Sequence, residues 1–171
     1  MRATHVALLA ALALSLTAQA ANPRAFDVFA GKWAGNLEYK DYQNPTRRVK
    51  IPVKLEVKPS DANAAIWDFK YDDFGKTVVS YETHSFKAGK YSVATRGQAQ
   101  VQRFTSADFQ ALSESGNGKA ALSGMETEVG RQVEVRRTIT LTPKKLTTLT
   151  ETRGKGEPFA FRNQSTYTRQ P

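Results

Sequence analysis

Hydrophobic and polar residues alternate along most of this chain with a period of two residues. One series runs through Val49, Ile51, Val53, Leu55 and Val57, separated by charged residues and one proline. A second series runs through Val133, Val135, Arg137, Ile139 and Leu141. Alternation of this kind is typical of β-strands that bury one face and expose the other. The pattern therefore predicts strands with one buried and one solvated face.

Turn-forming residues divide the chain at short intervals and predict about ten strands. The turns fall at 43–46, 59–63, 72–75, 87–90, 143–145 and 154–157. The segment 106–130 alternates poorly and indicates either short strands or a lid, so its structure is left open. No β-α-β spacing or long repeat is present. Because a meander of this length must protect its edge strands, we expect an all-β antiparallel up-and-down barrel.

The first 20 residues have the three parts of a secretory signal peptide. A basic start precedes the apolar run Val6–Leu16, and Ala18–Ala20 supplies a small-residue cleavage site. The run is far shorter than the roughly 20 residues that a membrane-spanning helix needs. We expect cleavage near Ala20, a single barrel domain over 21–171, no transmembrane segment, and a secreted or periplasmic location.

Three features of the mature chain resemble the calycin superfamily, which includes lipocalins, fatty-acid-binding proteins and nitrobindin-like barrels. A short helical stretch, 22–30, leads into Gly31-Lys32-Trp33, about ten strands follow, and the chain ends with Tyr167-Thr168-Arg169. In lipocalins a late basic residue packs across the tryptophan of the Gly-x-Trp motif. The resemblance implies that Arg169 covers Trp33, and that the short helix plugs one end of the barrel.

The chain also departs from two branches of that superfamily. Fatty-acid-binding proteins place Arg-x-Tyr on the last strand, whereas Tyr167 precedes Arg169 here. Haem-binding nitrobindin-like barrels need an axial histidine, and the mature chain offers only His84. His84 lies on the same face of its predicted strand as Ser80 and Glu82. Because both are polar, this face is expected to be at the surface. We therefore predict no cofactor.

Composition narrows the chemistry further. The chain has no cysteine, which excludes disulfides, thiolate metal sites and cysteine nucleophiles, and one mature histidine cannot form a usual zinc site. No nucleotide-binding or hydrolase motif is present, so no metal site and no catalytic residue is predicted. The formal net charge is +9, but the cations are scattered through the strands, a pattern that does not favour nucleic-acid binding.

Several polar residues occupy positions that the alternation assigns to the inside. Arg137 falls between Val135 and Ile139, and Arg103 lies near Val101. A buried guanidinium needs a carboxylate such as Glu126, a water-filled lumen or an anionic ligand, unless a bulge turns it outward. The predicted ligand-binding residues are two arginines, a tyrosine of the last strand and four aromatic wall residues: Arg137, Arg103, Tyr167, Trp67, Phe69, Tyr71 and Phe161.

Two functions are consistent with these patterns. The first is an exported, lipocalin-like binding protein for a small hydrophobic or amphipathic molecule, including an anionic one. The alternative is a barrel enzyme of the cyclase or isomerase type acting on a small lipophilic substrate, which needs only an inward carboxylate or tyrosine. Inward acids near an otherwise dry lumen would favour the enzyme, and an apolar cavity without an acid of perturbed pKa would favour the binder. The sequence specifies neither the ligand nor the oligomeric state.

Overall fold

The computed structural model describes residues 24–41, 43–44 and 46–171. The predicted signal peptide therefore lies outside the described residues. These residues form a 3-10 turn η1 (Asp27–Phe29), ten strands and, between the sixth and seventh strands, one helix. The strands are β1 (Gly31–Lys40), β2 (Arg48–Asp61), β3 (Ala64–Asp73), β4 (Lys76–Lys87), β5 (Lys90–Thr95), β6 (Val101–Thr105), β7 (Gly118–Glu128), β8 (Arg131–Leu141), β9 (Lys145–Arg153) and β10 (Ala160–Arg169), and the helix α1 is Phe109–Ser115.

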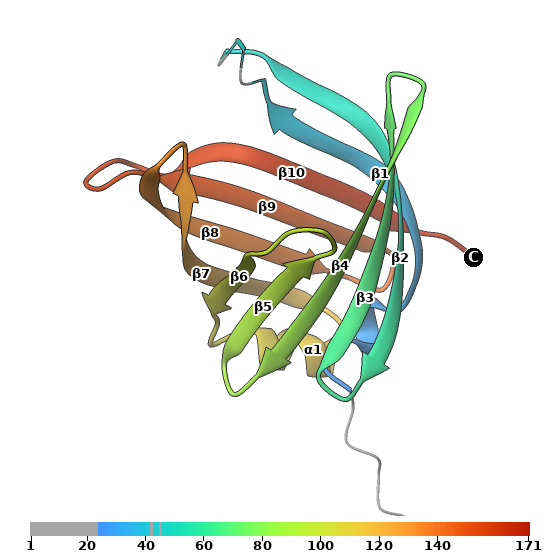
Figure 1. The fold of residues 1–171 in the computed structure, drawn as a ribbon. Helices are drawn as coiled ribbons and strands as arrows, with labels where there is room; N and C mark the ends of the chain where they lie inside the picture. The colour runs from blue at the N-terminus through green and yellow to red at the C-terminus, as the bar shows by residue number, and fades with distance from the viewer. Residues whose placement is uncertain (1–23, 42, 45) are drawn as a thin grey trace, which may run out of the picture.

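The ten strands form one closed antiparallel barrel (Figure 1). Each strand pairs with its neighbours in the sequence, and β1 pairs with β10 to complete the ring. The predicted up-and-down barrel of about ten strands is therefore confirmed. Within the part of the chain that the structure describes, no helix could serve as a membrane-spanning segment.

The alternating series face the interior as the sequence predicts. Val53, Leu55 and Val57 of β2 are buried, as are Val135 and Ile139 of β8. Their charged neighbours point outward because successive side chains of a strand lie on opposite faces. The two series therefore fix which face of the wall is the inside.

Aromatic residues close one end of the barrel. Phe26 and Phe29, around η1, are fully buried and pack against Phe109 of α1, with ring centroids 5.5 and 5.9 Å apart. Tyr91 packs on Phe109 from the wall, at 4.8 Å. The expected N-terminal plug is thus present as a single 3-10 turn, and α1 completes it at the lower end of the barrel in Figure 1.

Helix α1 lies in the segment for which short strands or a lid were predicted. Phe109, Leu112 and Ser113 are its buried residues, and their spacing of three and four places them on one helical face. Gly116 ends the helix in the left-handed conformation, with φ of 63°. Alternation was weak here because part of the segment repeats with helical rather than strand periodicity.

Trp33 and Arg169 meet at the same closed end, as the resemblance to lipocalins implies. The two residues are register partners on β1 and β10, and the guanidinium lies 4.1 Å from the centre of the indole. Arg169 also donates hydrogen bonds to the carbonyl groups of Val28, Ala30 and Pro143. The arginine therefore ties the N-terminal plug to the last strand.

A candidate ligand-binding site in the barrel lumen

A cavity of about 180 Å³ lies inside the barrel. Five of the seven predicted ligand-binding residues line it: Trp67, Phe69, Tyr71, Arg137 and Tyr167. The other lining residues are Leu37, Glu82, His84, Tyr91, Ile139, Thr148, Thr150, Asn163 and Ser165. The residues come from strands on all sides of the barrel, so the cavity is the lumen itself.

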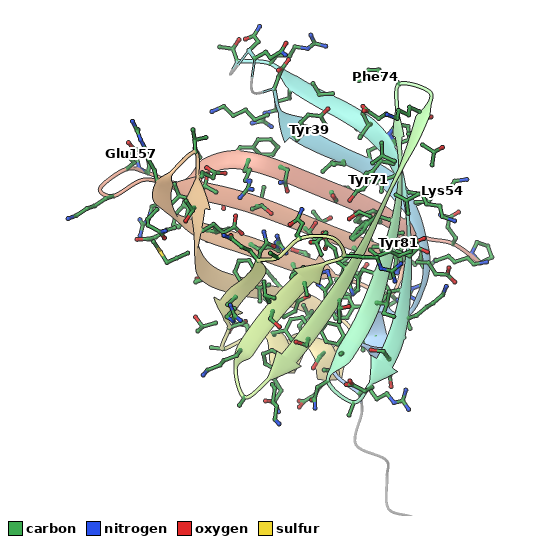
Figure 2. All side chains as sticks on the ribbon, viewed as in Figure 1. Tyr39, Lys54, Tyr71, Phe74, Tyr81 and Glu157 are labelled. Atoms are coloured by element: carbon green, nitrogen blue, oxygen red, sulfur yellow. The ribbon has the colours of Figure 1, made fainter. Side chains whose placement is uncertain are left out.

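One wall of the lumen is aromatic and belongs to β3. Trp67, Phe69 and Tyr71 alternate along the strand and face inward, with successive ring centroids 6.2 and 5.7 Å apart. Figure 2 labels Tyr71, the member of this series nearest the β3–β4 turn. This wall offers a continuous apolar surface to a planar group.

The facing wall, on β9 and β10, carries hydroxyl and amide groups. Thr150 pairs with Asn163 and Thr148 with Ser165, so the four side chains form two adjacent rows. Thr148, Thr150 and Asn163 have no side-chain hydrogen bond within the described chain. The wall therefore offers donors and acceptors that the protein itself leaves available, and the lumen is amphipathic rather than purely apolar.

Arg137 faces this cavity from β8. Its Nη2 donates one long hydrogen bond, 3.3 Å, to Oε1 of Gln102, and the guanidinium lies 5.1 Å from the centre of the Phe104 ring. No carboxylate oxygen of the described residues lies within 4.0 Å of its nitrogen atoms. Glu126, the acid proposed as an internal partner, instead binds Arg162 at 2.7 Å. Most of the donor capacity of Arg137 is therefore not used by the protein.

A hydrogen-bonded chain of three residues runs along the wall that β4 and β5 form in the lumen. His84 Nε2 lies 2.9 Å from Oε2 of Glu82, and His84 Nδ1 lies 2.6 Å from the hydroxyl group of Tyr91. The imidazole stacks on Trp67, with ring centroids 4.3 Å apart. His84 is only 4% exposed. The predicted surface position of His84 is therefore wrong.

The prediction failed at His84 because Ser80 and Glu82, which precede it on the same face of β4, are polar. Phe86 is the one buried apolar residue of that strand. Glu82 and His84 face the lumen, while Val78 and Val79 are exposed. Without an apolar series the sequence gives no sign of which face is buried. The available signal was the spacing of Glu82 and His84, which places both on the same face of one strand.

The environment of these groups sets their protonation. Burial lowers the pKa of His84 despite the nearby carboxylate, so the imidazole is neutral. Burial tends to raise the pKa of Glu82, but the hydrogen bond from His84 and the charge of Arg137 lower it on balance. Burial raises the pKa of Tyr91 well above its usual value. We therefore assign a neutral His84 that donates from Nε2 to an ionised Glu82 and accepts from Tyr91 at Nδ1.

Two predicted site residues lie outside the lumen. Arg103 is exposed, while its neighbours Gln102 and Phe104 are half-buried and buried. The alternation starts again after the loop that precedes β6. The inward positions of this strand are therefore Gln102 and Phe104, one residue away from the predicted Arg103. Phe161 precedes a register shift between Phe161 and Asn163, and its ring packs against the guanidinium of Arg48 at 3.9 Å. That β-bulge removes Phe161 from the inward series that Asn163 continues.

The described residues contain no group of three or more His, Cys, Asp or Glu side chains that could hold a metal ion. Both ring nitrogen atoms of His84 are engaged in hydrogen bonds, so neither is free to act as an axial ligand.

No protein-family model matches the sequence, and no curated protein is similar to it. The fold is similar to solved structures. Rv2717c from M. tuberculosis aligns with a TM-score of 0.58 and 13% identity, over 86% of this chain and 96% of that one. The S-type phycobiliprotein lyase CPES from Guillardia theta aligns with a TM-score of 0.54 and 10% identity, over 85% and 90%. At these identities the likeness is one of fold alone.

Proposed function

We propose that this protein binds a small amphipathic molecule in the barrel lumen and holds its anionic group at Arg137. The main support for the proposal is that the Arg137 guanidinium lines the cavity and has no carboxylate partner among the described residues. Arg137 is half-buried, and a cation that is partly removed from water is most stable when a partner satisfies its charge and donors. A ligand carboxylate would satisfy both, because it accepts two parallel hydrogen bonds from a guanidinium.

The walls and the size of the cavity describe the rest of the ligand. Trp67, Phe69 and Tyr71 supply an apolar face, and the hydroxyl and amide groups of β9 and β10 lie opposite. A volume of about 180 Å³ is below the roughly 300 to 1,000 Å³ of sites for drug-sized ligands. The proposed ligand is therefore small, with a planar apolar body and one anionic end.

Calorimetric titration with 3-phenylpropionate tests the proposal. This probe joins a carboxylate to a single aromatic ring. Arg137→Leu should weaken its binding by about 2 kcal/mol or more, roughly thirtyfold, because the partner of the carboxylate is lost. The fold should be retained, since the substitution removes a half-buried charge and extends an apolar series.

Arg103→Leu is the matched control, because Arg103 lies outside the lumen on a nearby strand. Its affinity for 3-phenylpropionate should equal that of the unmodified protein. Equal weakening by the two substitutions would mean that net charge, rather than a lumen contact, attracts the probe. Unchanged affinity in a folded Arg137→Leu variant would remove Arg137 from the site.

A second candidate function, a barrel enzyme of the isomerase type, is favoured by the inward acid Glu82. Its carboxylate is ionised and positioned by His84, as a general base requires. Arg137 in the same cavity could stabilise an oxyanion. Incorporation of solvent deuterium next to the carbonyl group of a small ketone, followed by NMR, tests this role. Exchange that persists in Glu82→Gln would exclude Glu82 as the base.

We also propose export of the protein, with cleavage near Ala20. The support is the charge, apolar run and small residues of 1–20. The intact mass of protein recovered from the periplasm or the medium tests it. A mass that still includes Val6–Leu16 would contradict the proposal.

A further inference from the structure

The lumen contains two opposite charges that do not pair with each other. Arg137 of β8 and Glu82 of β4 line the same cavity of about 180 Å³. No nitrogen of Arg137 lies within 4.0 Å of a Glu82 oxygen. The positive charge of Arg137 nonetheless helps to lower the pKa of Glu82. The cavity is therefore lined by one anionic and one cationic side chain, from two different strands.

Glu82 is only half satisfied by the protein. Its Oε2 accepts the hydrogen bond from His84, and its Oε1 has no hydrogen bond within the described chain. The side chain is 24% exposed, and an ionised carboxylate can accept about four hydrogen bonds. Oε1 is thus a strong acceptor that remains available inside the lumen.

Charge balance then restricts the ligand. His84 is neutral, so the charges of Arg137 and Glu82 sum to zero in the free lumen. A simple carboxylate would add a negative charge near Glu82, where the surrounding protein screens repulsion poorly. A ligand that carries both a carboxylate and an ammonium group would pair with both residues and leave the lumen neutral.

We infer that the natural ligand is a small zwitterion with an aromatic or similarly planar body. Its carboxylate pairs with Arg137, its ammonium group donates to Oε1 of Glu82, and its apolar body lies along the β3 wall. Trp67 is the register partner of Glu82 across β3 and β4, so the ammonium group would also lie near an indole, which attracts cations. The inference rests on the proposed function and narrows its ligand class.

Three matched probes test the inference by calorimetry on the unmodified protein. L-phenylalanine carries both charges, 3-phenylpropionate lacks the ammonium group, and 2-phenylethylamine lacks the carboxylate. L-phenylalanine should bind at least about tenfold more tightly than either of the others, because only it forms both charge pairs.

The Glu82→Gln substitution tests the same inference by removing the carboxylate that is proposed to bind the ammonium group. It should abolish the preference for L-phenylalanine over 3-phenylpropionate, while Glu56→Gln, the same change on the outer wall, should preserve it. Thermal unfolding of both variants verifies that each is folded. If Glu82→Gln does not fold, the ranking of the three probes on the unmodified protein still decides the question.

The outcomes separate this inference from the proposed function. If 3-phenylpropionate binds as tightly as L-phenylalanine, or if a folded Glu82→Gln variant keeps the preference, the zwitterion inference is wrong while the anion site stands. If neither carboxylate probe binds the unmodified protein, the proposed function fails and the inference fails with it.

Discussion

Arg169→Ala should destabilise the barrel by about 3 kcal/mol. The arginine donates to three backbone carbonyl groups, and each such bond contributes roughly 0.5 to 1.5 kcal/mol net. Its contact with Trp33 adds roughly 0.5 to 2 kcal/mol. The lower part of the summed range applies because the side chain is half-exposed and water can replace part of the lost hydrogen bonding.

Urea unfolding followed by far-UV circular dichroism measures this loss. For a domain of this size the melting temperature should also fall by roughly 6 to 12 °C. Arg169→Lys should recover part of the stability, since it keeps the cation near the indole but cannot reach three carbonyl groups. A loss below about 1 kcal/mol for Arg169→Ala would refute the conclusion that this residue ties the N-terminal plug to β10.

Three further substitutions or conditions test the fold and the lumen. Gly35→Ala should cost about 3 kcal/mol or more in urea unfolding, because a Cβ there would lie 1.8 Å from the carbonyl oxygen of Thr166; a loss under 1 kcal/mol would mean that β1 and β10 are farther apart. His84 should remain neutral in NMR titration well below pH 6.5, and stability should fall as the pH drops below that value, because the unfolded chain then binds the extra proton; a folded-state pKa above 6.5 would contradict the assignment. Tyr91→Phe should cost about 1 kcal/mol or more in urea unfolding, since it leaves His84 Nδ1 without its donor, and a neutral effect would show that this bond is dispensable.

The sequence predicted the barrel because its strongest strands have strict alternation. In β8 a one-residue shift in register would have exposed four aliphatic residues, so the inward position of Arg137 followed from its neighbours. The contact between Trp33 and Arg169 was predicted from the resemblance to lipocalins rather than from the alternation of hydrophobic and polar residues. Its geometry depends on the pairing of the first strand with the last, which no local signal specifies.

The incorrect predictions occur where local irregularities change which residues of a strand face the interior. Phe161 lies at a bulge, and Arg103 lies on a five-residue strand after a loop, where alternation is too short to set the inward face. The chain of Glu82, His84 and Tyr91 was missed for a different reason. A strand whose inward face has a single buried apolar residue, Phe86, has no hydrophobic period. The register of β4 with β5 pairs Phe86 with Tyr91, and this places Tyr91 within hydrogen-bonding distance of His84.

The most direct test of the lumen as a binding site is an isotope-filtered NOE experiment on labelled protein saturated with L-phenylalanine. The ring protons of the ligand should show contacts to the side chains of Phe69, Tyr71 and Ile139, which face the cavity from opposite walls. Contacts confined to residues of the outer wall, such as Lys54 and Lys70, would contradict binding inside the barrel.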